Sequence, residues 1–212
     1  MISIRMFVFN DFQENTYLLY DESNECIIID AGNYYDNENQ EVLDFIISKN
    51  IKPVRLLNTH CHIDHIVGNL FFSEKFNLAP EAHIEENFLI KNSVTAAGLF
   101  GLTVKQPPVI KKYLNDLDIV RFGHSEIQCI FVPGHSRGSL AFYSKEFKFV
   151  ITGDVLFNGS IGRTDLPGGD YNTIITSITE RLFTLPENVI IYPGHGHEST
   201  IVNELMNNPF FQ

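Results

Sequence analysis

Short runs of β-branched and aromatic residues alternate with polar segments along the N-terminal part of the chain. The runs are Ile2–Phe9, Asn15–Tyr20 and Cys26–Asp30, and the segments between them are rich in Asp, Asn, Glu and Ser. β-Branched and aromatic residues favour strands, and the short polar residues favour turns. The pattern therefore predicts that an antiparallel meander begins the fold.

Helical spacing replaces this alternation between Asn37 and Asn50, where apolar residues recur three and four positions apart. Pro53 then opens the apolar run Val54–Leu57, which predicts a buried strand. A second helical stretch covers about Ile63–Phe76. The chain thus passes from a meander to helices that alternate with buried strands.

The C-terminal half returns to strands. We predict strands at Ile119–Phe122, Ile127–Val132, Leu140–Tyr143, Phe147–Thr152 and Val189–Tyr192, and one amphipathic helix over about Tyr171–Phe183.

Residues 80–112, between the two halves, have a different character. Gly98, Gly101, Pro107 and Pro108 interrupt weak helical patterns there. We interpret this stretch, the cap segment, as a mobile cover over a substrate and not as a second domain. Residues 1–212 are accordingly expected to form a single domain.

Size and composition agree with a chain that folds around its own core. The protein has 212 residues, of which 44% are hydrophobic, and only three Cys, with no CxxC spacing. A chain of this size buries roughly 70% of its unfolded surface, so no disulfide framework is needed. The N-terminus lacks the pattern of a signal peptide, and no apolar run reaches the ~18 residues of a membrane span. We therefore expect a cytoplasmic protein that does not act at a membrane.

The charge balance narrows the class of partner. Fifteen Lys and Arg stand against 26 Asp and Glu, which gives a formal net charge of −11. Such a charge disfavours a nucleic-acid backbone as partner and leaves a small molecule as the expected one. The oligomeric state is left open.

The strongest local feature is the hexapeptide His60-Cys61-His62-Ile63-Asp64-His65. His60 and His62 stand two apart at the end of a predicted strand and can point to one side. Asp64 and His65 follow where a helix begins and can face a second point nearby. Imidazole and carboxylate groups suit Zn, Fe(II) or Mn. One hexapeptide can therefore supply ligands to two metal ions.

Three further strands end in residues that bind metals. His135 and His195 each follow an apolar strand and a Pro-Gly turn, and Asp154 follows the strand that ends at Gly153. Strands that deliver such residues at their C-terminal ends converge on one edge of a layered fold, where ligand sites lie. A lone Pro-Gly-His is often only a turn, but four such ends favour a common site.

This order of motifs resembles the metallo-β-lactamase superfamily over essentially the whole chain. The resemblance implies an α/β fold, an αββα sandwich of two mixed β-sheets flanked by helices. It also implies that His60, His62 and His135 hold one metal ion, that Asp64, His65 and His195 hold the other, and that Asp154 bridges both. Asp64 and Asp154 are the expected catalytic carboxylates, and the expected cofactors are two divalent ions, zinc first, with iron or manganese as alternatives.

Three segments are similar to the glyoxalase II (hydroxyacylglutathione hydrolase) branch in its short bacterial form: Gly153–Phe157, Gly162–Asp165 and Pro193–Gly196. The resemblance implies hydrolysis of a thioester by a metal-bridging hydroxide. Long members of that branch continue into a helical extension that supplies much of the glutathione site, whereas 17 residues (212 − 195) follow His195 here. Arg137 and His197 also depart from the pattern.

Two alternative functions stay open. One is a mononuclear iron persulfide dioxygenase of the same superfamily, although the Pro193–Gly196 run favours the hydrolase. The other is a metal-binding module without catalytic activity, and only the completeness of the ligand set speaks against it.

Asp30 also has two readings. It ends a strand before Gly32, which is typical of an Asx turn, while the resemblance implies that it orients a metal-bound His. We expect structural roles for the remaining polar candidates. His83, His124 and His197 are expected to be surface or loop residues, and Cys61 is expected to point away from the site. Arg163 and Asp165 should form a local ion pair, and Lys111 and Lys112 should be solvated cations.

Overall fold

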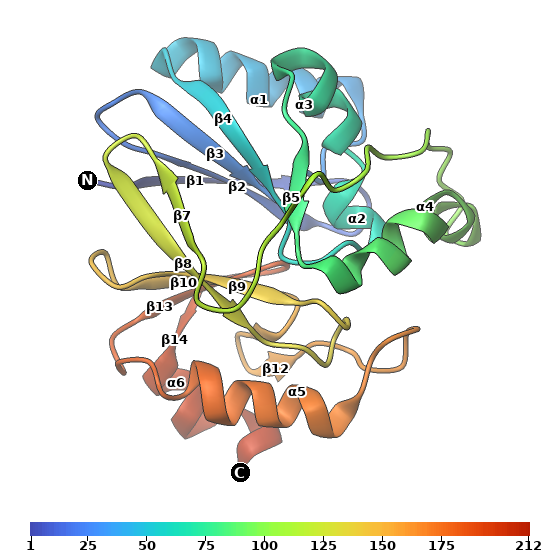
Figure 1. The fold of residues 1–212 in the computed structure, drawn as a ribbon. Helices are drawn as coiled ribbons and strands as arrows, with labels where there is room; N and C mark the ends of the chain where they lie inside the picture. The colour runs from blue at the N-terminus through green and yellow to red at the C-terminus, as the bar shows by residue number, and fades with distance from the viewer.

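Two mixed β-sheets lie face to face in the computed structural model, which describes residues 1–212 (Figure 1). The first sheet contains, in spatial order, β1 (Ser3–Phe9), β2 (Glu14–Tyr20), β3 (Glu25–Ile29), β4 (Lys52–Leu57), β5 (Pro80–Ala82) and β6 (Lys112–Tyr113). The second contains β14 (Ser199–Thr200), β13 (Ile190–Pro193), β10 (Phe149–Gly153), β9 (Leu140–Ser144), β8 (Ser125–Phe131) and β7 (Ile119–Phe122). A small hairpin pairs β11 (Leu156–Phe157) with β12 (Ser160–Ile161).

Helices cover the outer faces of both sheets (Figure 1). The helices of the protein are α1 (Asp36–Lys49), α2 (Ile63–Ile66), α3 (Asn69–Phe76), α4 (Asn87–Leu99), α5 (Tyr171–Ser177) with its π-helical continuation η2 (Ile178–Leu182), α6 (Ile201–Asn207), and the 3₁₀ turns η1 (Ile84–Glu86) and η3 (Pro209–Phe211). Residues of α1 and α3 pack on the first sheet, and residues of α5, η2 and α6 pack on the second. The αββα sandwich predicted from the sequence is confirmed.

Successive side chains of each strand pack alternately between the two sheets and under the covering helices. In β2, Tyr17 and Leu19 belong to the cluster between the sheets, while Leu18 between them belongs to the cluster under α1. In β3, Ile27 and Ile29 likewise face the second sheet. Successive side chains of a strand point to opposite faces, so strands that are apolar at nearly every position are buried on both sides.

The predicted meander is confirmed, since β1, β2 and β3 pair antiparallel in chain order. The pairs β3–β4 and β10–β13 are parallel, and each is connected by a segment that contains a covering helix. The two strands of each parallel pair run the same way, so β10 and β13 end toward the same edge of the second sheet.

The helix predicted over Ile63–Phe76 is two helices in the structure, α2 and α3. The amide of Gly68 donates to the carbonyl of Ala31 at 2.8 Å. The helical acceptor four residues earlier, the carbonyl of Asp64, instead accepts from Asn10 Nδ2 at 3.0 Å. Because both groups have partners outside the helix, the ladder breaks at this point.

The cap segment is tied to the body of the protein at both ends. It begins in β5 and finishes in β6, which extend the first sheet, and its middle forms α4. Ile90 and Ala97 of α4 pack with Cys61 and Ile63 of the hexapeptide His60–His65 in one buried cluster. Part of this segment is therefore core, and the substrate-covering role stays a prediction.

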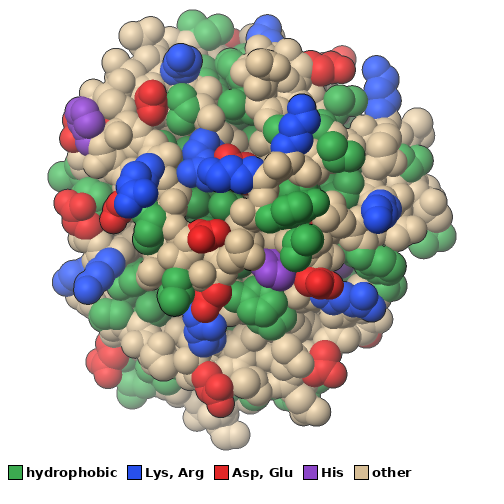
Figure 2. Space-filling model, in the orientation of Figure 1, with side chains coloured by type: hydrophobic (Ala, Val, Ile, Leu, Met, Phe, Trp, Pro, Cys, Tyr) green, Lys and Arg blue, Asp and Glu red, His purple; other side chains and the backbone are tan.

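Charged side chains of both signs are interspersed on the face drawn in Figure 2. Arg55 and Lys112 both pair with Glu81. None of the helices combines the length and the apolar character that a bilayer span requires.

Candidate metal centre

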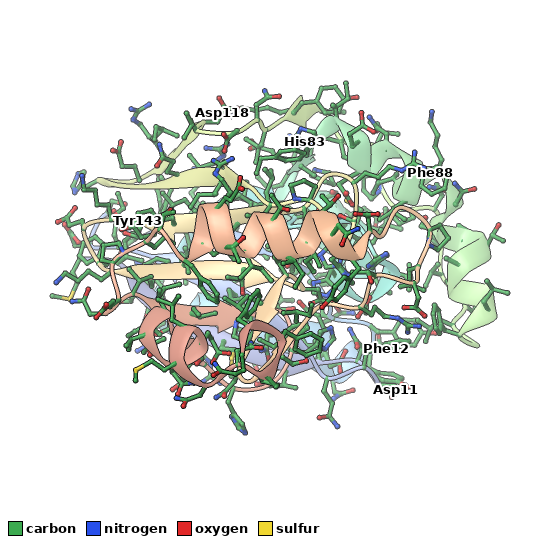
Figure 3. The ribbon with its side chains drawn as sticks, turned by 90° about the horizontal axis from the view of Figure 1, so that it is seen from below. Asp11, Phe12, His83, Phe88, Asp118 and Tyr143 are labelled. Atoms are coloured by element: carbon green, nitrogen blue, oxygen red, sulfur yellow. The ribbon has the colours of Figure 1, made fainter.

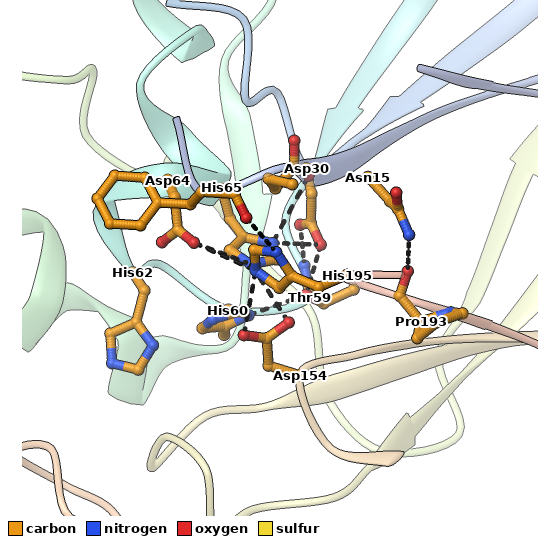
Figure 4. A network of polar contacts seen from close by, with 12 residues as sticks. Asn15, Asp30, Thr59, His60, His62, Asp64, His65, Asp154, Pro193 and His195 are labelled. Carbon is orange, nitrogen blue, oxygen red and sulfur yellow. Dashed lines mark hydrogen bonds and ion pairs between the residues drawn. The ribbon is translucent and has the colours of Figure 1, made fainter. Parts of the chain in front are cut away.

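The ends of four strands bring the predicted ligands together. His60 and His62 follow β4, His135 follows β8, Asp154 directly follows β10, and His195 follows β13. His62 is the N-cap of α2, so Asp64 and His65 lie on the first turn of that helix. Figure 4 shows six of these side chains close together: His60, His62, Asp64, His65, Asp154 and His195.

One group of nitrogens belongs to three His residues. His62 Nδ1 lies 2.8 Å from His135 Nε2, which in turn lies 3.2 Å from His60 Nε2. His60 and His135 are buried, and His62 is nearly so. Three ring nitrogens at these separations form a compact N₃ donor set of the kind that zinc and iron bind.

A second group lies beside it. His195 Nε2 is 3.2 Å from Asp64 Oδ2 and 3.3 Å from His65 Nε2, and the distance from His65 Nε2 to Asp64 Oδ2 is 3.7 Å. This set offers two nitrogens and a carboxylate. The separation of His60 and His62 from Asp64 and His65 is the one that the hexapeptide spacing predicts, and His135 and His195 join the groups that the family resemblance implies. A third set, Asp30, His60 and His65, overlaps both groups.

Asp154 lies between the groups. Its Oδ2 is 3.6 Å from His135 Nε2 of the first group and 3.5 Å from His195 Nε2 of the second. Its Oδ1 is buried without a hydrogen-bond partner. Gly194 makes this approach possible, since a Cβ there would lie 2.1 Å from Asp154 Oδ1.

The outer nitrogens of four His rings face polar partners that fix the tautomer. The contacts are His60 Nδ1 with Thr59 Oγ1 at 3.1 Å, His65 Nδ1 with Asp30 Oδ2 at 3.1 Å, His135 Nδ1 with the Arg163 carbonyl at 2.8 Å, and His195 Nδ1 with the Phe12 carbonyl at 3.0 Å. Carbonyl and carboxylate oxygens only accept, so the facing Nδ1 carries the hydrogen. The Nε2 lone pairs are then directed into the centre.

Asp30 serves both groups of ligands. It contacts His65 directly, and it accepts hydrogen bonds from the Thr59 amide at 2.7 Å and the Thr59 hydroxyl at 2.6 Å. Because that hydroxyl donates to Asp30, it is free to accept from His60 Nδ1. The carboxylate thus contacts one predicted ligand directly and another through Thr59, and this pattern supports the orienting role over a simple Asx turn.

Burial and neighbouring charge set the protonation of the metal-free centre. Burial lowers the pKa of His62 to about 3 and holds the pKa of His60 well below its usual range. Burial also acts to lower the pKa of His65, but the carboxylates of Asp154 and Asp64 outweigh it and raise that pKa well above its usual value. The first group is therefore neutral, while a proton on His65 offsets the buried carboxylates.

The donors fit divalent metal ions. The centre holds five imidazoles and two carboxylates, nitrogens of different rings face one another at 2.8–3.3 Å, and Asp154 Oδ1 is buried without a partner. Buried lone pairs that face one another are unfavourable unless a cation lies between them. When bound, such ions lower the pKa of a coordinated water toward neutrality and polarise a carbonyl oxygen.

Sequence reasoning missed two buried carboxylates next to the centre. Glu86 accepts from the Cys61 amide at 2.6 Å, the Ser136 hydroxyl at 2.7 Å and the Gly138 amide at 2.8 Å, and thereby joins the two loops that carry the first group of His. Glu14 is fully buried, and its Oε1 lies 3.7 Å from His65 Nδ1. Neither residue belongs to a local sequence motif, so both can be identified only from their tertiary contacts.

The other singled-out residues lie outside the centre. His124 and His197 are exposed, His83 stacks on Phe131, and Lys111 and Lys112 are exposed. Cys61 faces the apolar cluster under α4. Arg163 and Asp165 form a bidentate pair with both distances 2.7 Å, as predicted.

A cleft of about 240 Å³ opens onto the centre. Five of the seven predicted ligands line it, while His60 and His65 lie deeper. Comparisons with known proteins agree with this geometry: the family model described as "Metallo-beta-lactamase superfamily" matches residues 9–195. The chain belongs to the metallo-β-lactamase superfamily.

Relatives in this superfamily match nearly full length. The "Probable metallo-hydrolase YqgX" of Bacillus subtilis is 38% identical over 200 residues, which cover 93% of this chain and 92% of the relative. The "Hydroxyacylglutathione hydrolase GloC" of Haemophilus influenzae is 34% identical over 206 residues, which cover 94% and 93%. A metal-dependent hydrolase is the activity class that these relatives support.

Two solved structures share the fold closely. The BLEG-1 B3 metallo-β-lactamase superposes with a TM-score of 0.90 at 29% identity, covering 99% of this chain and all of that one. TTHA1623, solved in a di-iron-bound form, superposes with a TM-score of 0.87 at 33% identity, covering 97% and 99%. Superfamily proteins of this kind bind divalent metals, and the di-iron form leaves more than one metal open for this chain.

Proposed function

We propose that this chain is a binuclear metal-dependent hydrolase that cleaves a 2-hydroxyacyl thioester. The observation that carries the proposal is the division of seven His and Asp side chains into two adjacent groups with Asp154 between them. The similarity to a hydroxyacylglutathione hydrolase over most of both chains supports the same reaction class.

The chemistry of the leaving group favours a thioester over an amide or an alkyl ester. Apart from the predicted ligands, the only titratable side chain that lines the cleft is Arg163. A guanidinium does not release its proton at neutral pH, so it is a poor general acid. A leaving thiol has a pKa near roughly 8.5 and departs as the thiolate without protonation. The cleft therefore lacks the general acid that an amide or alkyl-ester leaving group requires. A thiolate leaves without such an acid, so thioester cleavage remains possible.

Residues around the centre orient the predicted ligands. Asp30, Thr59 and the Phe12 carbonyl hold the imidazoles in one orientation, so no reorganisation is needed as charge develops. The proposed cofactors are two ions, with zinc expected first and iron or manganese as alternatives. The proposed partner is a small-molecule thioester, and we propose a cytoplasmic location.

The test is an anaerobic assay. Zinc-loaded protein under nitrogen should release thiol from an S-lactoyl thioester, because hydrolysis consumes no oxygen. His195→Ala should lower kcat by roughly 100-fold or more, since it removes one ligand of the second group. His197→Ala is the matched control, because this exposed neighbour touches no ligand and should behave like the wild type.

Each contrary outcome supports a different reading. If zinc-loaded protein were inert and iron-loaded protein consumed oxygen with a persulfide, the chain would be a dioxygenase. If a β-lactam were cleaved in preference to the thioester, it would share the activity named for BLEG-1. If none of these activities were found, the chain would be a metal-binding module without catalytic activity. If thioester cleavage persisted undiminished in His195→Ala, the second group of ligands would have no part in the reaction.

A further inference from the structure

The cleft has a polar floor and apolar walls. The predicted ligands form the floor, and the walls are Phe12, Ile63, Ala96, Phe100 and Leu166. They come from the β1–β2 turn, the start of α2, the last turns of α4 and the loop before α5. Segments far apart in the sequence thus place apolar groups beside the reacting centre.

Phe12 and Phe100 form the outer wall as a pair. Their ring centroids are 5.5 Å apart with an interplanar angle of 89°, an edge-to-face contact. Figure 3 shows Phe12 on the side of the molecule where α4 lies. Phe100 remains 50% exposed, so a ligand in the cleft can bury more of its ring.

The backbone of Phe12 links this wall to the metal centre. Its carbonyl accepts from His195 Nδ1 at 3.0 Å, while its ring contacts Phe100. The wall therefore stands at a fixed place beside one predicted ligand. An apolar group on a substrate that reached the centre would meet these rings.

Apart from the proposed metal ions in its floor, the cleft offers little to an anionic substituent. Arg163 is the only cationic side chain that lines it, and both arms of its guanidinium bond to Asp165 at 2.7 Å. A bidentate pair of this kind already satisfies the cation. The volume of about 240 Å³ also lies below the roughly 300–1,000 Å³ of pockets that enclose drug-sized ligands.

We propose that this cleft selects thioesters that carry an uncharged apolar group of about phenyl size, in preference to thioesters of a thiol with carboxylates such as glutathione. Phe12 and Phe100 determine this specificity. The inference rests on the proposed thioester hydrolysis, and it adds which substituent the site accepts.

Three thioesters test the preference and locate the apolar group. They are S-lactoylglutathione, S-mandeloylglutathione with a phenyl on the acyl side, and the S-lactoyl ester of benzyl mercaptan with a phenyl on the thiol side. Zinc-loaded protein should turn over at least one phenyl-bearing ester with a kcat/KM about tenfold above that of lactoylglutathione, chiefly through KM, because an aromatic contact with buried area contributes that much.

Substitutions connect the preference to the wall. Phe100→Ala, and separately Phe12→Leu, should reduce the preference for the phenyl-bearing ester by about tenfold. Leu99→Ala is the matched control: it removes a neighbouring side chain that is 83% exposed and does not line the cleft. This control should retain the wild-type preference, and all variants should retain their metal content.

Binding of the two products of hydrolysis, the carboxylate and the thiol, separates this inference from the proposed function. Calorimetry should show that mandelate, or benzyl mercaptan on the thiol side, binds the zinc-loaded protein more tightly than lactate or glutathione, respectively. If no thioester were cleaved but this difference appeared and vanished in Phe100→Ala, the proposed reaction would fail and the apolar cleft would stand. Equal binding of both members of each pair, or faster turnover of lactoylglutathione, would overturn the specificity proposal.

Discussion

Glu86 belongs to no sequence motif, yet its carboxylate joins the two loops that carry the first group of His. Its Oε2 accepts from the Cys61 amide, between His60 and His62, while its Oε1 accepts from the Ser136 hydroxyl and the Gly138 amide. Burial raises the pKa of this carboxyl, and these three hydrogen bonds oppose that shift. Substitution of Glu86 should therefore disturb metal binding from outside the ligand set.

The two oxygens have different partners, which makes the effect of each substitution specific. Glu86→Gln can keep its amide oxygen at the Oε1 position, so only the Cys61 amide loses its acceptor. One unsatisfied buried N–H costs about 1–3 kcal/mol. Glu86→Ala also deprives the Gly138 amide of its acceptor, so two such groups sum to about 2–6 kcal/mol. The Ser136 hydroxyl retains Ser139 Oγ at 2.7 Å.

Urea unfolding and zinc titration together measure this prediction. We expect Glu86→Gln to lose stability with an unchanged m-value, and to weaken one of two zinc-binding steps by roughly 10- to 100-fold, as loss of an orienting contact does. The matched control is Glu85→Gln in the same turn, since that side chain is exposed. If both variants bound two zinc ions equally well and unfolded at the same urea concentration, Glu86 would have no part in holding the site.

Two further substitutions probe the centre itself. Asp30→Asn should weaken zinc binding by roughly 10- to 100-fold in a chelator competition, because the carboxylate that orients His65 loses its charge; zinc affinity equal to that of the wild type would contradict the orienting role. Gly194→Ala should lose at least one metal ion by elemental analysis, because the added Cβ would lie 2.1 Å from Asp154 Oδ1. Gly98→Ala, in α4 with nothing within 4 Å of the added Cβ, should keep its metal and gain up to about 1 kcal/mol of stability; equal metal loss in both Gly variants would refute the steric argument.

The fold could be predicted well because local patterns and a family resemblance agree. Strand alternation located β1 to β3, and helical spacing located α1, within a few residues of the observed bounds. The break at Gly68 could not be predicted, because its cause is a contact between Asn10 and the Asp64 carbonyl across 54 positions. Short elements such as β14 and α6 were also missed, since their few residues carry no clear period.

The predicted ligands of the site could be identified from the sequence, but the groups that orient them could not. The spacing of His and Asp residues in the sequence indicates the ligands, and the structure brings all seven predicted ligands together. The groups that orient them are partly main-chain carbonyls, such as that of Phe12, which no side-chain motif encodes. Glu86 lies in the segment interpreted as a cap, and its hydrogen-bond partners lie 25 to 52 positions away in the sequence. Its role could therefore not be predicted from local patterns.

The most direct test of the account is a crystal structure of the zinc-loaded protein with anomalous scattering measured at the zinc edge. The account predicts two peaks in each chain. One should lie among His60, His62 and His135, and the other among Asp64, His65 and His195, with Asp154 in contact with both. A single peak at saturating zinc, or two peaks that Asp154 does not join, would contradict the binuclear centre on which the proposed hydrolysis rests.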